Sequence, residues 1–213
     1  MTSADFAQLL ARGRELRNVE FKAPGPRSSQ FLLGKVLRAM LGMANLQDGG
    51  LVILGVDEVN NTLVASGISE GDLQTWSHDD LAATMGNYAD PAVEFDVESF
   101  DFEGKQFLAL RVYEFEDVPI LCKKAYVLKE DNRDKVVLRQ GACYVRNRHK
   151  PATTEPPTQA EMRDLLDLAT RKGVRRFVQQ AQAAGLAVAG PVQPDDASQF
   201  RAQAQQIWEG MVH

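Results

Sequence analysis

The sequence has few of the residues on which several classes of protein depend. Two cysteines, Cys122 and Cys143, are too few for a disulfide-stapled secreted fold, and neither they nor the three scattered histidines show zinc-ligand spacing. No run of eighteen apolar residues is present, so we expect no transmembrane helix. The first residues lack the apolar core of a signal peptide. We therefore expect a cytoplasmic protein with reduced cysteines and no membrane partner.

Motifs for nucleotide binding and nucleophilic catalysis are also missing. Asp48-Gly49-Gly50 ends an expected helix instead of beginning one and has no phosphate-loop pattern, so no cofactor-binding residue is assigned. No arrangement of serine, histidine and aspartate indicates a catalytic triad. Cys143 has His149 nearby in sequence, but its neighbours are apolar and no third partner is evident.

Basic residues are outnumbered by acidic residues overall, 24 to 29, but are concentrated in one region. The net charge is −5, which disfavours a polyanionic partner. From Asp57 to Asp117 the sequence has fifteen acids and two bases, whereas from Ile120 to Lys150 it has nine bases and three acids. Such segregation can create a local field for phosphates, although a solvated, lysine-rich hairpin is the alternative interpretation.

Hydrophobic periodicity and turn residues predict an α/β (α+β) fold with a mixed sheet flanked by helices. The expected helices are 4–14, 30–46 and 78–88, and the expected strands are 17–22, 51–56, 63–65, 93–99, 106–113, 119–127, 136–139 and 143–147. Asn60-Asn61 predicts a hairpin turn after the continuous apolar run 51–56. From Pro151 the composition changes, and three further helices are expected at 158–171, 174–185 and 195–209. We expect a domain at 1–155 and a helical extension at 156–213.

A carboxylate and a lysine share one face of the first expected strand. Glu20 and Lys22 are two residues apart and should point the same way, with Val19 and Phe21 packed behind them. This pair suits phosphodiester hydrolysis, with the carboxylate holding a divalent metal and the lysine supporting charge on the phosphate. The same pair is also common on solvated strands. Glu15 can join Glu20 only if the chain bends between them.

Asp57 follows the apolar run 51–56, at the end of a strand where functional acids are common in α/β folds. It is a candidate third metal ligand. Alternatively, Asp57 and Asn60-Asn61 only form the hairpin turn.

Basic residues interleave with tyrosine in the late hairpin region. The candidate nucleic-acid-binding residues are Lys123, Lys124, Arg139, Tyr144, Arg146, Arg148 and Lys150. Lysine and arginine would bind phosphates, and Tyr144 could stack on a base. Alternatively, Tyr144 and Val145 are interior sheet residues and the charges are solvated.

Together these segments resemble a known family. Glu15–Lys22, the helix end Met43–Gly50, the strand Leu51–Glu58 and the late Tyr144–Arg148 look like the AlbA-like domain of Schlafen proteins and their prokaryotic relatives. The resemblance covers about residues 4–155. It departs from the family pattern at Asn147, where glycine is common. Because Glu58 directly follows Asp57, the resemblance leaves open which of these two acids is the third acid of the family pattern.

The resemblance implies a role on nucleic acid. In several Schlafen members, two glutamates and an aspartate with a divalent metal cleave tRNA or rRNA; the matching residues are Glu15, Glu20 and Asp57, with Lys22 as the following lysine and Mg²⁺ or Mn²⁺ as the metal. One hypothesis is therefore a metal-dependent endoribonuclease that acts on tRNA-like structured RNA. The other is a non-catalytic, regulatory DNA- or RNA-binding module. The larger Schlafen core pairs two such lobes, so a homodimer could supply the second.

Overall fold

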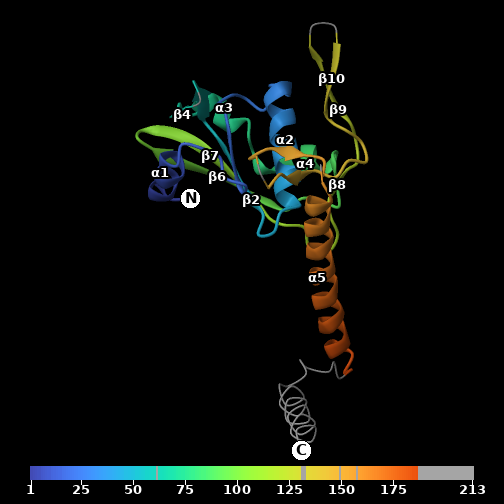
Figure 1. Ribbon diagram of the computed structural model, residues 1–213. Helices are drawn as coiled ribbons and strands as arrows, with labels where there is room; N and C mark the ends of the chain where they lie inside the picture. Colours follow the sequence, from blue (N-terminus) through green and yellow to red (C-terminus); the bar gives the residue numbers. More distant parts are fainter. Residues whose placement is uncertain (61, 131–132, 149, 157, 187–213) are drawn as a thin grey trace, which may run out of the picture. The chain divides into compact units, whose positions relative to one another are not determined.

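A four-stranded mixed sheet forms the centre of the protein. The computed structural model describes residues 1–60, 62–130, 133–148, 150–156 and 158–186. The sheet has the order β1-β2-β7-β6 (Figure 1). Its strands are β1 Val19–Lys22, β2 Gly50–Leu54, β6 Phe95–Phe102 and β7 Lys105–Val112. β1 and β2 are parallel, as a helical crossover between them allows, and the other pairs are antiparallel. The predicted α/β class with a mixed sheet is confirmed.

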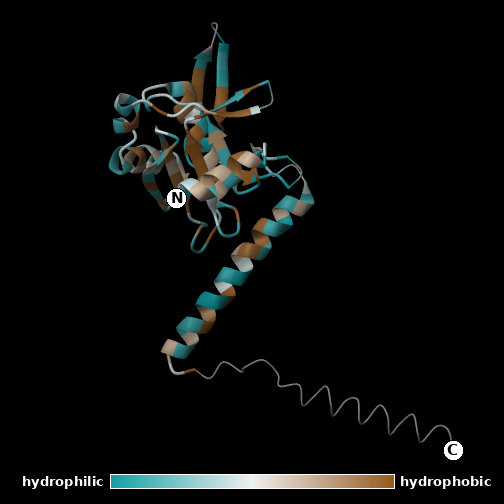
Figure 2. Ribbon diagram, turned by 90° about the vertical axis from the view of Figure 1, so that its left-hand side faces the viewer, coloured by the Kyte–Doolittle hydropathy of each residue, from teal (hydrophilic) through white to brown (hydrophobic). Residues whose placement is uncertain are grey.

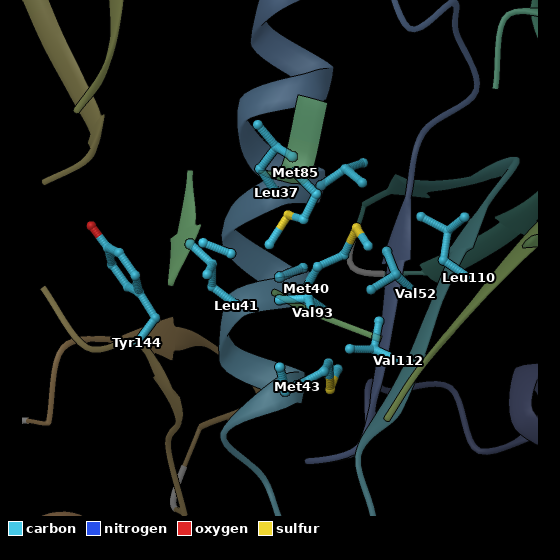
Figure 3. Close-up of a cluster of buried hydrophobic side chains, with 14 of the residues drawn as sticks. Leu37, Met40, Leu41, Met43, Val52, Met85, Val93, Leu110, Val112 and Tyr144 are labelled. Atoms are coloured by element: carbon cyan, nitrogen blue, oxygen red, sulfur yellow. The ribbon is translucent and has the colours of Figure 1, made fainter. Parts of the chain in front are cut away.

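The two faces of the sheet pack against different helices. Val52 of β2 joins the large hydrophobic cluster around α2 (Gln30–Ala44). The next residue, Ile53, joins a smaller cluster around α1 (Ser3–Ala11). Figure 3 shows Met40 between α2 and Val52. This alternation places α2 on the sheet face to which Glu20 and Lys22 point, because Val19 and Phe21 belong to the α1 cluster.

α2 is close to the helix predicted at 30–46. The side chain of Ser29 caps it by accepting from the Leu32 amide. Two glycines inside the helix allow neighbouring elements to approach its backbone. A Cβ at Gly34 would lie 2.8 Å from the Tyr126 ring, and a Cβ at Gly42 would lie 2.5 Å from Cγ2 of Thr153. These close contacts explain why glycine occupies both positions, although each glycine destabilises a helix by about 1 kcal/mol relative to alanine.

The glycine pair after α2 has a structural role. Gly49 has a φ of +67°, and a Cβ there would lie 2.1 Å from the Val112 carbonyl oxygen. Gly55, with a φ of +106°, ends β2, so the predicted strand 51–56 is divided in two. The second part, β3 (Val56–Val59), pairs with β4 (Thr62–Ala65) in the predicted hairpin.

Short elements complete this part of the chain. They are α3 Glu70–Gln74, α4 His78–Gly86, β5 Ala89–Asp90, β8 Leu121–Cys122, β9 Tyr126–Glu130, β10 Arg133–Leu138, β11 Val145–Arg146 and β12 Thr153–Thr154. The strand pairs are β5–β8, β9–β10 and β11–β12. Figure 1 shows the β9–β10 hairpin extending away from the sheet. Its base is held because the Tyr126 hydroxyl donates to the Gln30 carbonyl, 2.7 Å away.

One long helix, α5 (Gln159–Ala183), replaces two of the three helices predicted after Pro151. The expected break between residues 171 and 174 is absent, and Gly173 lies inside the helix with no atom within 4 Å of its Cβ position. Figure 2 shows hydrophilic and hydrophobic residues alternating along α5. The third predicted helix, 195–209, lies outside the described residues. The chain divides into two compact units, Met1–Thr170 and Arg171–His213.

Cys122 and Cys143 are both free thiols. Over the described ranges, no helix is long and apolar enough to cross a membrane.

Candidate functional site

Arg146 lies in the interior of the fold, where it binds Glu20. Its side chain is 0% exposed, and its guanidinium donates to the Glu20 carboxylate, to the Leu16 and Arg17 carbonyls, and to Oγ1 of Thr153. Burial lowers the pKa of Arg146, and the nearby Glu20 opposes that change. Because arginine stays charged at any physiological pH, this is a buried ion pair.

The second oxygen of Glu20 also has a cationic partner. Oε1 accepts from Nζ of Lys22, while Oε2 accepts from Arg146. The contact between Glu20 and Lys22 confirms that the two side chains share a strand face. It also means that each carboxylate oxygen of Glu20 is already bound by a positive group.

Glu15 approaches Glu20 because the chain bends between them. The Val19 amide donates to the Leu16 carbonyl at 3.2 Å, and these two residues form an antiparallel bridge. Oε1 of Glu15 then accepts from the Phe21 amide at 2.8 Å. Burial raises the pKa of Glu15, with a smaller contribution from the charge of Glu20, and the Phe21 hydrogen bond and Lys22 oppose the rise.

A groove of about 810 Å³ lies beside Glu15. Its charged lining residues are Arg14, Glu15, Lys22, Lys35 and Glu58, and its other walls include the loop Ala23–Pro26, Phe31 and Leu63. The volume is in the range of about 300–1,000 Å³ typical of ligand pockets. Three cations and two acids meet here, so the groove is locally basic although the chain has a net charge of −5.

Glu58, and not Asp57, lines this groove. The two residues are adjacent on β3 and therefore point to opposite faces of the strand. Val56, on the same face as Glu58, also lines the groove. The sequence left open whether Asp57 or Glu58 is the third acid of the family pattern. In the structure Glu58 is the one that lines the groove with Glu15 and Lys22.

The three predicted acids do not fit a divalent-metal site in this arrangement. Both oxygens of Glu20 bind cationic side chains, one oxygen of Glu15 binds a backbone amide, and Asp57 is not part of the groove wall. A hard cation needs several oxygen ligands directed at one point. In the part of the chain that the structure describes, no three histidine, cysteine, aspartate or glutamate residues are grouped to hold an ion.

Phe31 is an exposed aromatic residue at the groove, and two lysines lie over its ring. The residue is 44% exposed. Nζ of Lys35 lies 4.1 Å from the ring centroid, and Nζ of Lys135, from β10, lies 5.5 Å from it. Burial lowers the pKa of Lys35, and the positive charges of Lys22 and Lys135 lower it further. An anion at this point would relieve the repulsion among the three ammonium groups.

The residues predicted to bind nucleic acid are divided between surface and interior. Lys123, Lys124 and Lys150 are exposed. Arg139 is also at the surface, where it pairs with Glu155. Arg148 pairs with Asp164 in the same way. These five side chains lie outside the groove lining.

Tyr144 and Arg146 differ from the expectation of surface contacts. Tyr144 is 3% exposed and its hydroxyl accepts from the Arg139 amide at 2.8 Å. It lies on the opposite side of α2 from Val52 (Figure 3). The alternative interpretation, in which Tyr144 and Val145 are interior residues, agrees with the structure, because both side chains are buried in the hydrophobic cluster around α2.

Asn45 is a buried residue whose role the sequence did not reveal. Its Nδ2 donates to the Ile120 and Tyr144 carbonyls, both at 2.9 Å, and its Oδ1 accepts from the Ile120 amide at 2.8 Å. It thus joins the end of α2 to two later segments. The available signal was a polar residue directly after an apolar helix. Phe31 and Lys35 also gave a signal, since they are four residues apart on one helix.

Comparison with known proteins identifies the relatives of this arrangement. A family model described as Schlafen, AlbA_2 matches residues 15–150, more than half of the 213-residue chain. No curated protein matches the sequence.

Solved structures include two similar proteins. The DIP2311 protein from Corynebacterium diphtheriae is 20% identical over 62% of this chain and 26% of its own, with a TM-score of 0.40. The N-terminal domain of a putative ATP-dependent DNA helicase RecG-related protein from Nitrosomonas europaea is 19% identical over 75% of this chain and 98% of its own, with a TM-score of 0.44. The chain thus spans about a quarter of the first protein.

Proposed function

The chain belongs to the Schlafen, AlbA_2 family, and on this premise we propose that it binds nucleic acid in the groove lined by Arg14, Lys22 and Lys35. The observation that carries the proposal is that these three cations line one cavity together with the exposed aromatic residue Phe31, over whose ring Lys35 lies. Phosphate contacts need positive side chains, and stacking needs an open aromatic face. RNA with a tRNA-like structure is the first substrate to test.

The exposed basic residues outside the groove extend the contact surface. Lys123, Lys124 and Lys150 contribute outer phosphate contacts in this proposal. Arg139 and Arg148 contribute only after they exchange Glu155 and Asp164 for phosphates, so their effect on affinity is smaller. We therefore expect Lys35 to contribute more to the affinity for nucleic acid than the exposed basic residues outside the groove do.

Metal-dependent cleavage by Glu15, Glu20 and Asp57 is not part of the proposal. Mg²⁺ or Mn²⁺ at Glu20 would compete with Arg146 and Lys22 for the carboxylate, and displacement of Arg146 would leave a buried cation unpaired. The proposed function is therefore the binding of nucleic acid without cleavage. The homodimer that could supply a second lobe is a separate prediction, and this proposal concerns the groove of one chain.

Binding of labelled tRNA, measured by fluorescence anisotropy at several salt concentrations, tests the proposal. The wild type should bind more weakly as salt rises, and Lys35→Ala should reduce the salt slope by about 1. Lys105→Ala is the matched control, since Lys105 is exposed and is not among the residues that line the groove. Salt-insensitive binding, or equal effects of the two variants, would overturn the proposal.

A cleavage assay is the second part of the test. Total tRNA is incubated with the protein and Mn²⁺, with and without a chelator, alongside Glu20→Gln. The proposal expects intact RNA in every lane. A product that forms only with Mn²⁺, and that disappears in the variant while circular dichroism shows the variant still folded, would show catalysis and overturn the binding-only function.

A further inference from the structure

Phe31 is an exposed aromatic residue of the groove lining, and it can distinguish an unpaired base from a phosphate. The groove cations would accept any polyanion, whereas an aromatic ring gains from a base only when the face of that base is free. In a duplex the base faces are stacked on one another and closed to side chains. We infer that the groove takes a single-stranded segment of nucleic acid, with one unpaired base stacked on Phe31 and its neighbouring phosphates bound by Lys35 and Lys135.

The position of Phe31 on α2 supports this inference. Its neighbours Leu32 and Val36 are buried in the core, yet the Phe31 ring is 44% exposed and lines the groove. Capping by Ser29 and the bond from Tyr126 to the Gln30 carbonyl fix the backbone on both sides of the cap. The ring is therefore presented to solvent on a rigid element, as a stacking platform requires.

The two lysines complete a site for one nucleotide. They come from different elements, α2 and β10, and both ammonium groups lie near the same ring. Within the described ranges, no carboxylate forms a salt bridge with Lys35. Lysine side chains are long and rotatable, so a stacked base can move an ammonium group from the ring to an adjacent phosphate without a change in the backbone.

Charge at this point also favours an anionic strand. The positive charges of Lys22 and Lys135 both act on Lys35 and add to the effect of burial, while Glu20, which binds Lys22, opposes them. A phosphate beside Lys35 would offset this repulsion. The inference rests on the proposed function, because it names the nucleic-acid form that the same groove takes.

The test compares a labelled single-stranded RNA with a fully paired, blunt-ended RNA duplex of the same length. Wild-type protein should bind the single strand at least about fivefold more tightly. Phe31→Ala should lose at least about fivefold in affinity for the single strand and should remove the preference, since one stacked base contributes about 1–3 kcal/mol.

Two variants serve as controls. Tyr113→Ala removes another exposed aromatic residue with a cation, Arg111, over its ring, but outside the groove, so it should bind as the wild type does. Phe31→Trp keeps a ring at the site. It should retain affinity, and its added fluorescence should be quenched by the single strand and not by the duplex.

The outcomes separate the two claims. If Phe31→Ala binds both probes like the wild type while Lys35→Ala still weakens binding, the stacking inference is wrong and the groove remains the binding site. A preference for the duplex would also overturn the inference. If neither probe binds in a salt-sensitive way, the proposed function itself fails.

Discussion

Arg146 donates to the carboxylate of Glu20 although 126 residues separate them in the sequence. Arg146 also donates to the carbonyls of Leu16 and Arg17, so one side chain joins β11 to the bend that precedes β1. Both partners belong to motifs that carry the family resemblance. In this structure they hold the fold together, and Glu20 is less available for chemistry than its motif indicates.

Glu20→Gln tests this structural role. The substitution keeps the shape of the side chain but leaves the buried guanidinium of Arg146 without a counter-charge, so the free energy of unfolding should fall by about 3–5 kcal/mol. Urea denaturation followed by circular dichroism measures the loss. Asp79→Asn, at a fully exposed carboxylate, should leave the unfolding midpoint unchanged. A loss below about 1 kcal/mol for Glu20→Gln would show that the pair contributes little to stability.

Glu15→Gln should change how stability depends on pH. Because burial raises the pKa of Glu15, the folded protein binds a proton at this site more readily than the unfolded chain does. The wild type therefore loses stability from this group as the pH rises from the unfolded value near 4.5 through the raised folded value. The amide oxygen of glutamine can still accept a hydrogen bond from the Phe21 amide, so the variant keeps that bond. The glutamine side chain does not ionise, so the variant lacks this contribution to the pH dependence of stability.

Urea denaturation between pH 4 and pH 8 measures this difference. The two proteins should differ least at the acidic end, and the variant should gain relative to the wild type as the pH rises. A wild type that gains on the variant over the same range would contradict the burial of Glu15.

Gly42→Ala should destabilise the protein even though alanine favours helices. The added methyl group would lie 2.5 Å from Cγ2 of Thr153, and overpacking of this kind costs about 1–3 kcal/mol. Gly173→Ala is the matched control in α5, where the new Cβ meets no atom within 4 Å, and it should stabilise by about 0.5–1 kcal/mol. Thermal unfolding measures both effects: the midpoint should fall for Gly42→Ala and rise for Gly173→Ala. Equal shifts for the two would mean that β12 does not contact α2 closely.

Neither cysteine should react with a thiol reagent while the protein is folded. Burial raises the pKa of the Cys143 thiol to about 11, and burial also raises the pKa of Cys122. At pH 8 only about one part in a thousand of Cys143 is then thiolate, the reactive form. A disulfide-exchange assay should detect two thiols in denaturant and almost none in native buffer. Rapid native reaction of one equivalent would contradict this burial.

Local features of the fold followed from the sequence. The period of two along β1 correctly placed Glu20 and Lys22 on one face, and the apolar spacing of α2 gave that helix within two residues. The bend that Glu15 required is present. These features depend on residues close together in the chain, for which side-chain period and turn chemistry are sufficient.

Long-range contacts did not follow from the sequence. Arg146 looked like a surface base because its neighbours Arg148 and Lys150 are surface bases, and nothing local signals a carboxylate 126 residues away. The approach of Lys135 to Phe31 depends in the same way on how the β9–β10 hairpin packs on α2. The predicted end of a helix at residue 171 was wrong: Gly173 lies inside α5, where a glycine with open space around it costs too little to end a helix.

The affinity of Lys35→Glu for a labelled single-stranded RNA at low salt tests the central claim most directly. Lys35 has no salt-bridge partner in the described ranges, so reversing its charge should not disturb the fold, and Lys105→Glu makes the same change in net charge elsewhere. We predict a loss of at least about tenfold for Lys35→Glu and a much smaller loss for Lys105→Glu, because a phosphate contact becomes a local repulsion in the first variant alone. Equal affinities for the two variants would contradict the assignment of the groove as the nucleic-acid-binding site.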